Sequence, residues 1–147
     1  MLERVRASGV EDVVVVLGAY EVEASETVIR CPDWERGPGA SLRCGLAALG
    51  AEVEAAVVLL ADGPDLAPAA IDRLIAVWRG EPVLAASYGG VRGHPVLLAR
   101  AAWPQVPDEG ARALGAVLVP CDDLGSPGDV DVPDDLPEWL RPPPDER

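Results

Sequence analysis

An aspartate at the end of an apolar run is the residue of this sequence best suited to chemistry. Asp62 follows the run 57–61 and precedes Gly63-Pro64-Asp65. If the run is a buried strand, the carboxylate emerges where a sheet opens to solvent, which is where α/β proteins bind ligands. A carboxylate there can hold Mg²⁺, which binds proteins through one or two carboxylates together with substrate phosphates. Asp before Gly-Pro is also a common turn or helix-capping residue, so both interpretations stand.

A second pair of aspartates lies near the C-terminus. Asp129 and Asp131 are two residues apart in the turn-rich stretch 125–133, so they share a side wherever that stretch is extended. One of them can complete a metal site with Asp62, because two aspartates from different loops suffice for Mg²⁺. The alternative is solvated surface, where most carboxylates of an acidic chain lie.

A glycine-rich segment, residues 36–45, has features that suit an anion or a nucleotide. It offers glycines for close backbone approach, a hydroxyl at Ser41, a helix N-terminus and two arginines, Arg36 and Arg43. Its spacing matches neither a Walker P-loop nor G-x-G-x-x-G. The alternative is a glycine-rich loop that starts a helix with Ser41 as its cap.

The remaining reactive side chains carry weaker signals. His94, the single histidine, lies between Gly93 and Pro95, where a histidine is more often a structural turn residue than a general base. The cysteines are odd in number, widely separated and free of C-x-x-C spacing; they are Cys31, Cys44 and Cys121. We therefore expect neither a disulfide framework nor a zinc site, and reduced thiols in the cytosol.

Strand and helix patterns alternate along the chain. The β-branched run 13–17 is typical of a strand buried on both faces. The other expected elements are strands at 57–61, 82–87 and 116–119, an apolar partner at 95–98 that forms a hairpin or an antiparallel edge, and helices at 40–49, 69–78 and 110–114, the second led by Pro68. This alternation predicts βαβ units and a mostly parallel sheet.

Length and charge narrow the function classes. With 147 residues, 49% of them apolar, the chain can bury one core, and we expect one domain over 1–136 with a Pro-rich acidic tail at 137–147. A net charge of −13 repels nucleic acid and anionic membranes, while a small phosphorylated ligand can be bridged by a divalent cation. The longest apolar runs are too short to cross a bilayer.

Six segments resemble, in chain order, those of the MobA-like nucleotidyltransferases, most closely the branch that contains molybdenum cofactor cytidylyltransferases. The segments are 13–18 (VVVVLG), 32–46 (PDWERGPGASLRCGL), 59–65 (LLADGPD), 93–98 (GHPVLL), 108–112 (DEGAR) and 128–136 (GDVDVPDDL). Each is weak alone, and their order over residues 2–136 carries the resemblance.

The resemblance implies an α/β fold, a Rossmann-like three-layer sandwich with a mostly parallel sheet, that binds CTP or GTP. Asp62 and Asp131 match the family's Mg²⁺-holding aspartates, and His94 lies in a segment like the family's loop near the second substrate. The segment that lines the nucleotide pocket in the family matches residues 34–45, which include Gly37, Ser41, Arg43 and Gly45. The implied reaction transfers a nucleoside monophosphate to a phosphorylated acceptor such as molybdopterin, in the cytoplasm.

The chain departs from the family pattern in two places. Family members begin with a strand and a loop whose Arg and Lys grip the triphosphate, whereas this chain begins at what resembles the following helix, residues 2–7. The position after the metal-binding aspartate is commonly Gln in this branch and is Gly63 here. The chain is therefore either N-terminally truncated by a gene model that omits about 30 residues or more, or an inactive relative that binds a nucleotide or a partner. A missing strand leaves its neighbours unpaired, so we expect self-association through an exposed sheet edge.

Overall fold

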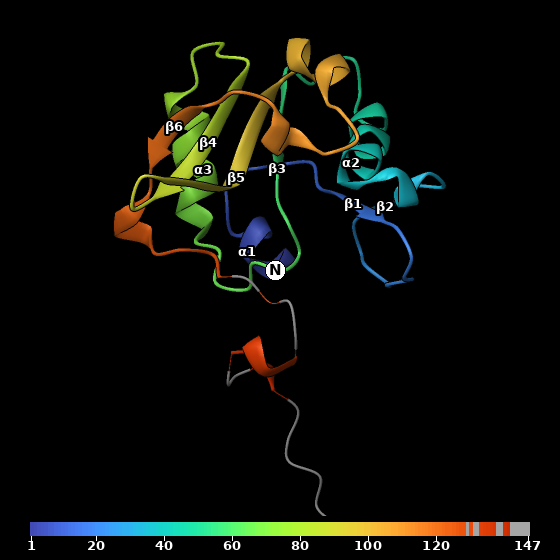
Figure 1. Ribbon diagram of the computed structural model, residues 1–147, viewed down its shortest axis with the longest axis horizontal. Coiled ribbons are helices and arrows are strands. Elements are labelled where there is room, and N and C mark those ends of the chain that lie inside the picture. Colours follow the sequence, from blue (N-terminus) through green and yellow to red (C-terminus); the bar gives the residue numbers. More distant parts are fainter. Residues whose placement is uncertain (129, 131–132, 138–139, 142–147) are drawn as a thin grey trace, which may run out of the picture.

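The computed structural model describes residues 1–128, 130, 133–137 and 140–141 (Figure 1). The strands are β1 (Val14–Leu17), β2 (Thr27–Arg30), β3 (Ala55–Val58), β4 (Val83–Tyr88), β5 (Val91–Ala99) and β6 (Val117–Pro120). The α-helices are α1 (Leu2–Arg6), α2 (Pro38–Ala47) and α3 (Pro68–Val77). Short 3₁₀ helices are η1 (Trp34–Arg36), η2 (Arg100–Gln105), η3 (Ala111–Ala113), η4 (Asp122–Leu124) and η5 (Pro133–Asp135).

The strands form two sheets that mix parallel and antiparallel pairs. The larger sheet has the order β3-β5-β4-β6, in which β5 is antiparallel to both neighbours and β6 is parallel to β4. The smaller sheet is the parallel pair of β1 and β2. The predicted hairpin of β4 and β5 forms, and it places β5 inside the sheet, which is why antiparallel pairs accompany the parallel ones.

Helices cover both faces of the larger sheet, and this confirms the α/β three-layer class. Strand side chains alternate between the faces. Ala85 and Leu98 face the core beside Leu46 of α2, while Leu84 and Leu97 face the core beside Leu74 of α3. Figure 1 shows α3 behind the four-stranded sheet and α2 beside β1. We call these two sides the α2 face and the α3 face.

Strand β1 is less buried than its sequence predicts. The run 13–17 is typical of a strand covered on both faces, yet every residue of β1 is only half-buried, whereas Val83 to Ser87 of β4 are buried. Among the described residues β1 pairs only with β2, and β3 pairs only with β5. Val13 nevertheless packs in one cluster with Val57 of β3, so the two sheets lie next to each other with unpaired edges.

The ends of the elements agree with local sequence signals. Pro68 is in the first turn of α3 as predicted, because proline lacks the N–H that is unpaired there in any helix. Helix α2 begins at Pro38, earlier than expected, and β5 begins at Val91 rather than at Pro95. Strand β2 was not predicted.

The expectation of unpaired thiols is wrong for two cysteines. Cys31, at the end of β2, and Cys44, on α2, form a disulfide with their Cα atoms 5.8 Å apart, within the usual range for such a bond. The pair is 13 residues apart in sequence, so the disulfide closes a loop that contains most of the glycine-rich segment. Cys121 is free and buried.

Two expectations concern membrane crossing and the tail. Over the described ranges, no helix combines the length and apolar character that a bilayer span requires. In the predicted tail, residues 138–139 and 142–147 lie outside the described residues, so the domain division at residue 136 stays a prediction.

Candidate functional site

Asp62 lies in the turn that follows β3, at the edge of the larger sheet where β5 begins. In the antiparallel register Val58 stands opposite Val96, so the residues after Val58 run toward the first residues of β5. His94 is among those residues, and the negative charge of Asp62 acts on its ring. The strand ends at Val58 rather than at residue 61 and is half-buried rather than buried, and the half-buried Asp62 lies four residues after its end.

Two backbone hydrogen bonds attach a distant segment to the Asp62 turn. The N–H of Asp65 donates to the carbonyl of Pro127 over 2.7 Å, and the N–H of Val130 donates to the carbonyl of Asp62 over 3.1 Å. A Cβ atom on Gly63 would lie 3.0 Å from Cβ of Pro127. Glycine at position 63, where the related branch commonly has Gln, therefore leaves room for this attachment.

Arg73 of α3 holds the start of the same C-terminal segment. Its guanidinium donates to both carboxylate oxygens of Asp123, over 2.7 and 2.8 Å, and to the carbonyl of Pro120. These hydrogen bonds lower the pKa of Asp123 to about 2. The chain between β6 and Val130 is therefore fixed at two points.

The second predicted metal ligand is next to this attachment. Asp129 and Asp131 lie outside the described residues, and they flank Val130, whose N–H binds the carbonyl of Asp62. The approach of the Asp131 carboxylate to Asp62 stays a prediction. Within the described part of the chain, no group of three or more His, Cys, Asp or Glu side chains is arranged to hold a metal ion.

The glycines of the segment 36–45 have packing roles. Cβ atoms on Gly37 and Gly39 would lie 2.3 Å from the carbonyl oxygen of Asp108 and 1.6 Å from that of Pro107. Gly37 also has a φ of 136°, which favours glycine. The N–H of Gly39 donates to the carbonyl of Asp108 over 2.9 Å. The start of α2 thus packs directly on the backbone of residues 107–108.

Both arginines of this segment bind Asp108. Arg43 donates to one carboxylate oxygen of Asp108 and, over 2.8 Å, to the carbonyl of Val106. Arg36 reaches the other carboxylate oxygen at 3.3 Å. These contacts hold the pKa of Asp108 below its usual range, chiefly through the hydrogen bond from Arg43. A nucleotide-binding role for Arg43 stays a prediction, and it has to coexist with this ion pair.

The other two predicted residues of the segment lie inside α2. Ser41 is in the helix interior and half-buried, and the N-cap is Gly37 without a side-chain bond, so the alternative of Ser41 as the cap is wrong. A Cβ atom on Gly45 would lie 2.6 Å from Cγ2 of Val16. Gly45 therefore lets α2 approach β1, and substrate-binding roles for Ser41 and Gly45 stay predictions.

His94 is half-buried at the start of β5. Its peptide bond to Pro95 is cis, and its carbonyl accepts a hydrogen bond from the Tyr88 hydroxyl over 2.8 Å. Burial lowers the pKa of His94 from its ordinary value, and the positive charges of Arg92 and Arg112 lower it further, against the opposing effect of Asp62. The imidazole is thus favoured in its neutral form beside Asp62.

Sequence reasoning did not select Arg92 or Arg112 as site residues. Arg92 precedes His94 by two residues in β5, and its guanidinium donates to the carbonyls of Ala111 and Leu114, which lie on the α2 face. Arg112 belongs to one of the six segments that carry the family resemblance. The closeness of Arg92 to His94 in the sequence is the signal that could have joined them.

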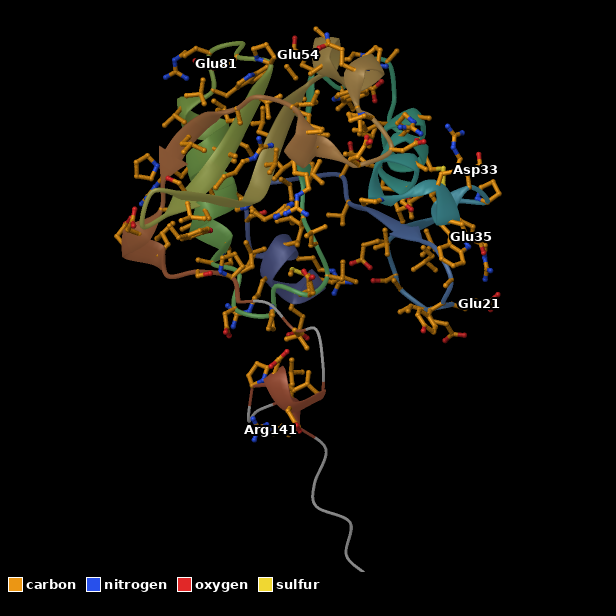
Figure 2. The ribbon with its side chains drawn as sticks, viewed as in Figure 1. Glu21, Asp33, Glu35, Glu54, Glu81 and Arg141 are labelled. Carbon is orange, nitrogen blue, oxygen red and sulfur yellow. A yellow bond between two sulfur atoms is a disulfide. The ribbon has the colours of Figure 1, made fainter. Side chains whose placement is uncertain are left out.

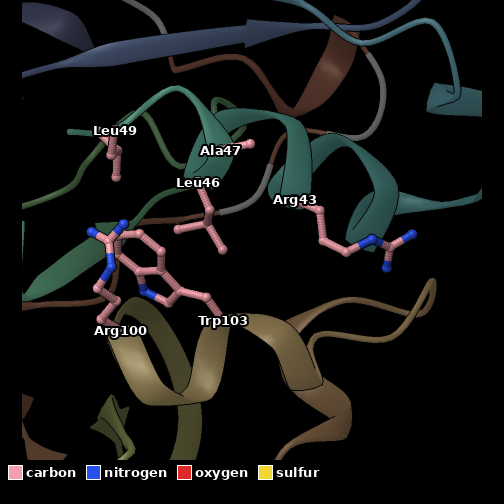
Figure 3. A pocket seen from close by; sticks show the side chains of 6 residues that line it. All are labelled: Arg43, Leu46, Ala47, Leu49, Arg100 and Trp103. Carbon is pink, nitrogen blue, oxygen red and sulfur yellow. The ribbon is translucent and has the colours of Figure 1, made fainter. Parts of the chain in front are cut away.

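A shallow cavity of about 270 Å³ lies between α2 and η2 (Figure 3). It is lined by Arg43, Leu46, Ala47, Leu49, Arg100 and Trp103. Arg100 lies 4.6 Å from the centre of the Trp103 ring and donates to the carbonyls of Gly50 and Val53. Neither Asp62 nor His94 is among the lining residues, so this cavity is distinct from the turn that holds Asp62.

The family model for MobA-like NTP transferase domains matches residues 1–122. The chain belongs to this family. The match spans Asp62, the segment 36–45 and His94. No curated protein gives a significant match to the MobA-like domain.

Solved structures share its fold. A crystal structure of Rv0371c from Mycobacterium tuberculosis H37Rv superposes with a TM-score of 0.72 at 24% identity, covering 91% of this chain and 77% of that one. A homologue from Mycobacterium sp. strain JC1 gives 0.74 at 22% identity, covering 91% and 76%. A third structure, Rv0371c in complex with manganese, gives 0.71 at 23% identity, covering 91% and 79%.

The close packing of Gly39 gives a test of the site's framework. We expect Gly39→Ala to lower the free energy of unfolding by about 1–3 kcal/mol or more, because its Cβ collides with the carbonyl of Pro107. Urea denaturation measures the change. Gly115→Ala is the matched control, since a Cβ there meets nothing within 4 Å. Equal stabilities of Gly39→Ala and the control would contradict the packing.

Proposed function

We propose that this MobA-like domain transfers a nucleoside monophosphate from CTP or GTP to a phosphorylated acceptor, such as molybdopterin, in molybdenum cofactor biosynthesis. In the reaction, an oxygen of the acceptor phosphate attacks the α-phosphorus of the nucleotide in line, and pyrophosphate leaves. We assign this reaction to the cytoplasm, where the nucleotides are available.

The attachment of residues 127–130 to the Asp62 turn is the observation that supports this assignment. It brings the backbone beside Asp131 within hydrogen-bond distance of the backbone of Asp62. Carboxylates that meet at a strand end form a donor set suited to Mg²⁺. In the proposal, Asp62 and Asp131 hold this cofactor, which when bound neutralises charge on the transferring phosphates.

The remaining predicted residues contact the substrates in this proposal. Residues 34–45 line the nucleotide, with Gly37 and Gly45 allowing close backbone approach and Ser41 and Arg43 offering polar contacts. His94, which is favoured as a neutral imidazole beside Asp62, lies near the acceptor. Nucleic acid and membrane surfaces are not partners in this proposal, because the net charge is −13.

The second candidate function is a nucleotide- or partner-binding module without catalysis. The two arginines of the glycine-rich segment, Arg36 and Arg43, favour this candidate. Both already form ion pairs with Asp108, which competes with any contact to a transferring phosphate. A single arginine on the transferring phosphate can be worth about a thousandfold or more in related phosphoryl chemistry. Release of pyrophosphate from CTP or GTP with an acceptor present separates the enzyme from the binding module.

The partner that we propose besides the substrates is a second copy of the chain, paired through an unpaired strand edge. Within the described residues, β1 and β3 each have one strand neighbour. A hollow of about 240 Å³ opens between the start of β1 and Val53, which precedes β3. Such an edge is a template for strand pairing between chains.

The metal assignment predicts a specific loss of binding. In titrations of CTP and GTP with Mg²⁺, we expect Asp62→Ala to weaken the metal-dependent binding by about 100-fold or more, because one metal ligand is removed. Asp65→Ala is the matched control, since Asp65 is an exposed carboxylate on the same turn. If Asp62→Ala and the unchanged protein give equal heats of nucleotide binding, Asp62 is not a ligand of the metal.

The edge proposal predicts concentration-dependent association. Sedimentation velocity over a range of concentrations should show a dimer, and Val15→Lys on β1 should weaken it by about tenfold or more, because a buried, unpartnered charge is costly. Val91→Lys adds the same charge at a position that is 70% exposed and serves as the control. A monomer at every concentration would rule out this partner.

A further inference from the structure

The disulfide between Cys31 and Cys44 joins two elements that differ in how much they are buried. Cys31 directly follows β2, a four-residue strand whose two end residues are exposed. Cys44 lies in α2, which packs on the larger sheet through Leu46. The N–H of Cys31 donates to the carbonyl of Leu17 over 3.0 Å, so the end of β2 is also attached to β1. The disulfide therefore links the exposed smaller sheet to the core of the domain.

The loop that the disulfide closes, residues 32–43, is exposed in its first half and packed in its second. Residues 32–36 are all exposed, and Figure 2 shows Asp33 and Glu35 at the outer edge of the molecule, away from the four-stranded sheet. From Gly39 onward the chain packs on residues 107–108. Arg36 reaches Asp108, but an ion pair between exposed side chains contributes little to stability. The disulfide is thus the covalent tie for the half of the loop that packs least.

The two cysteines differ in access to solvent, and the less accessible one has a partner for its reduced form. Cys31 is 2% exposed and Cys44 is half-buried, so Cys44 is the residue that a thiolate from solvent can approach. Sγ of Cys31 lies 3.4 Å from the carbonyl oxygen of Ala40, within range of a hydrogen bond from a thiol. Reduction therefore leaves the buried Cys31 thiol with an acceptor, and both redox states fit the same packing.

We propose that the Cys31–Cys44 disulfide is a reversible redox switch that sets how firmly the segment 32–43 is held. In the cytoplasm, where the proposed function places the reaction, disulfides are rare, and those that form are usually catalytic or redox-sensing. Most of this segment belongs to the stretch that lines the nucleotide in that proposal. The inference therefore rests on the proposed function for its effect on nucleotide binding, and adds regulation to the same site.

A dithiol reductant supplies the two electrons that open the bond. One of its thiolates attacks Sγ of Cys44 and forms a mixed disulfide, the bond between the cysteines breaks, and Cys31 leaves as a thiolate that takes up a proton. The second thiolate of the reductant then attacks its own sulfur in the mixed disulfide, and Cys44 leaves as a thiolate that is protonated in turn. The products are two cysteine thiols and the disulfide of the reductant, and a disulfide oxidant reverses the steps.

The first test is a count of thiols in the full chain, made after quenching and denaturation. The oxidised protein should show one thiol, that of Cys121, and the native protein equilibrated with dithiothreitol should show all three. Oxidised glutathione should restore the form with one thiol, and circular dichroism should show that both forms are folded. The inference is overturned if the native protein keeps its disulfide in dithiothreitol, or if oxidised glutathione forms none.

Hydrogen–deuterium exchange tests whether the bond holds the segment. We expect the backbone amides of residues 27–37 to exchange faster by about tenfold or more after reduction, because a cross-link over a loop of this length restricts the open states. The amides of α3, which packs on the other face of the larger sheet, should exchange equally in both forms. Equal exchange of residues 27–37 in the two forms overturns the inference.

Two variants separate this pair from the third cysteine. Cys44→Ser cannot form the disulfide, so its residues 27–37 should exchange as in the reduced protein, with or without dithiothreitol. Cys121→Ala removes the free thiol on the α3 face and should keep the difference between the two forms. A Cys44→Ser protein that still responds to dithiothreitol contradicts the assignment. The two forms of the unchanged protein are compared without any variant, so a folding defect does not remove the test.

Nucleotide affinity connects the switch with the proposed function. In titrations of CTP with Mg²⁺, the oxidised protein should bind more tightly than the reduced protein by about tenfold or more, because a loosened segment has to be ordered on binding. Equal affinities overturn the link between the disulfide and the site. If neither form binds CTP, the proposed function fails, whereas the thiol counts and exchange rates still decide on the switch.

Discussion

The site depends on the attachment of residues 127–130 to the turn after β3. Two backbone hydrogen bonds, from Asp65 to Pro127 and from Val130 to Asp62, hold parts of the chain that are more than sixty residues apart in sequence. The hydrogen bonds from Arg73 to Asp123 fix the segment just before it. Glycine at position 63 leaves space for Pro127. These contacts bring the backbone of Val130 to the turn that contains Asp62, at the sheet edge where His94 also lies.

Much of the fold could be predicted because its signals are local. The spacing of apolar residues in α3 and the proline at its start locate that helix, and the apolar runs of β3 and β4 locate two strands. Strand β2 gives no such signal, because it is only four residues long and only its two central residues are half-buried, between exposed ends. Its pairing with β1 depends on contacts between strands that no local pattern reports.

The site was predictable only in part, since residue type does not reveal a side chain's partner. Gly37 and Gly39 were expected to approach a ligand, and in the structure they approach the backbone of residues 107–108. Arg43 was expected to meet a nucleotide and binds Asp108, a residue 65 positions away. The disulfide of Cys31 and Cys44 was missed because it depends on how β2 and α2 pack. The run 57–61 predicts a buried strand that leads directly to Asp62, whereas β3 ends at Val58 and is only half-buried, so Asp62 lies in the turn four residues beyond it.

The most direct test of the account is the position of a bound divalent ion relative to Asp62 and Asp131. Crystals of the protein soaked with Mn²⁺ and CTP would give an anomalous scattering peak at the metal. The account predicts one peak within coordination distance of both carboxylates, at the edge of the sheet beside His94. A peak bound by neither aspartate, or an Asp131 carboxylate that points away from Asp62, would contradict it.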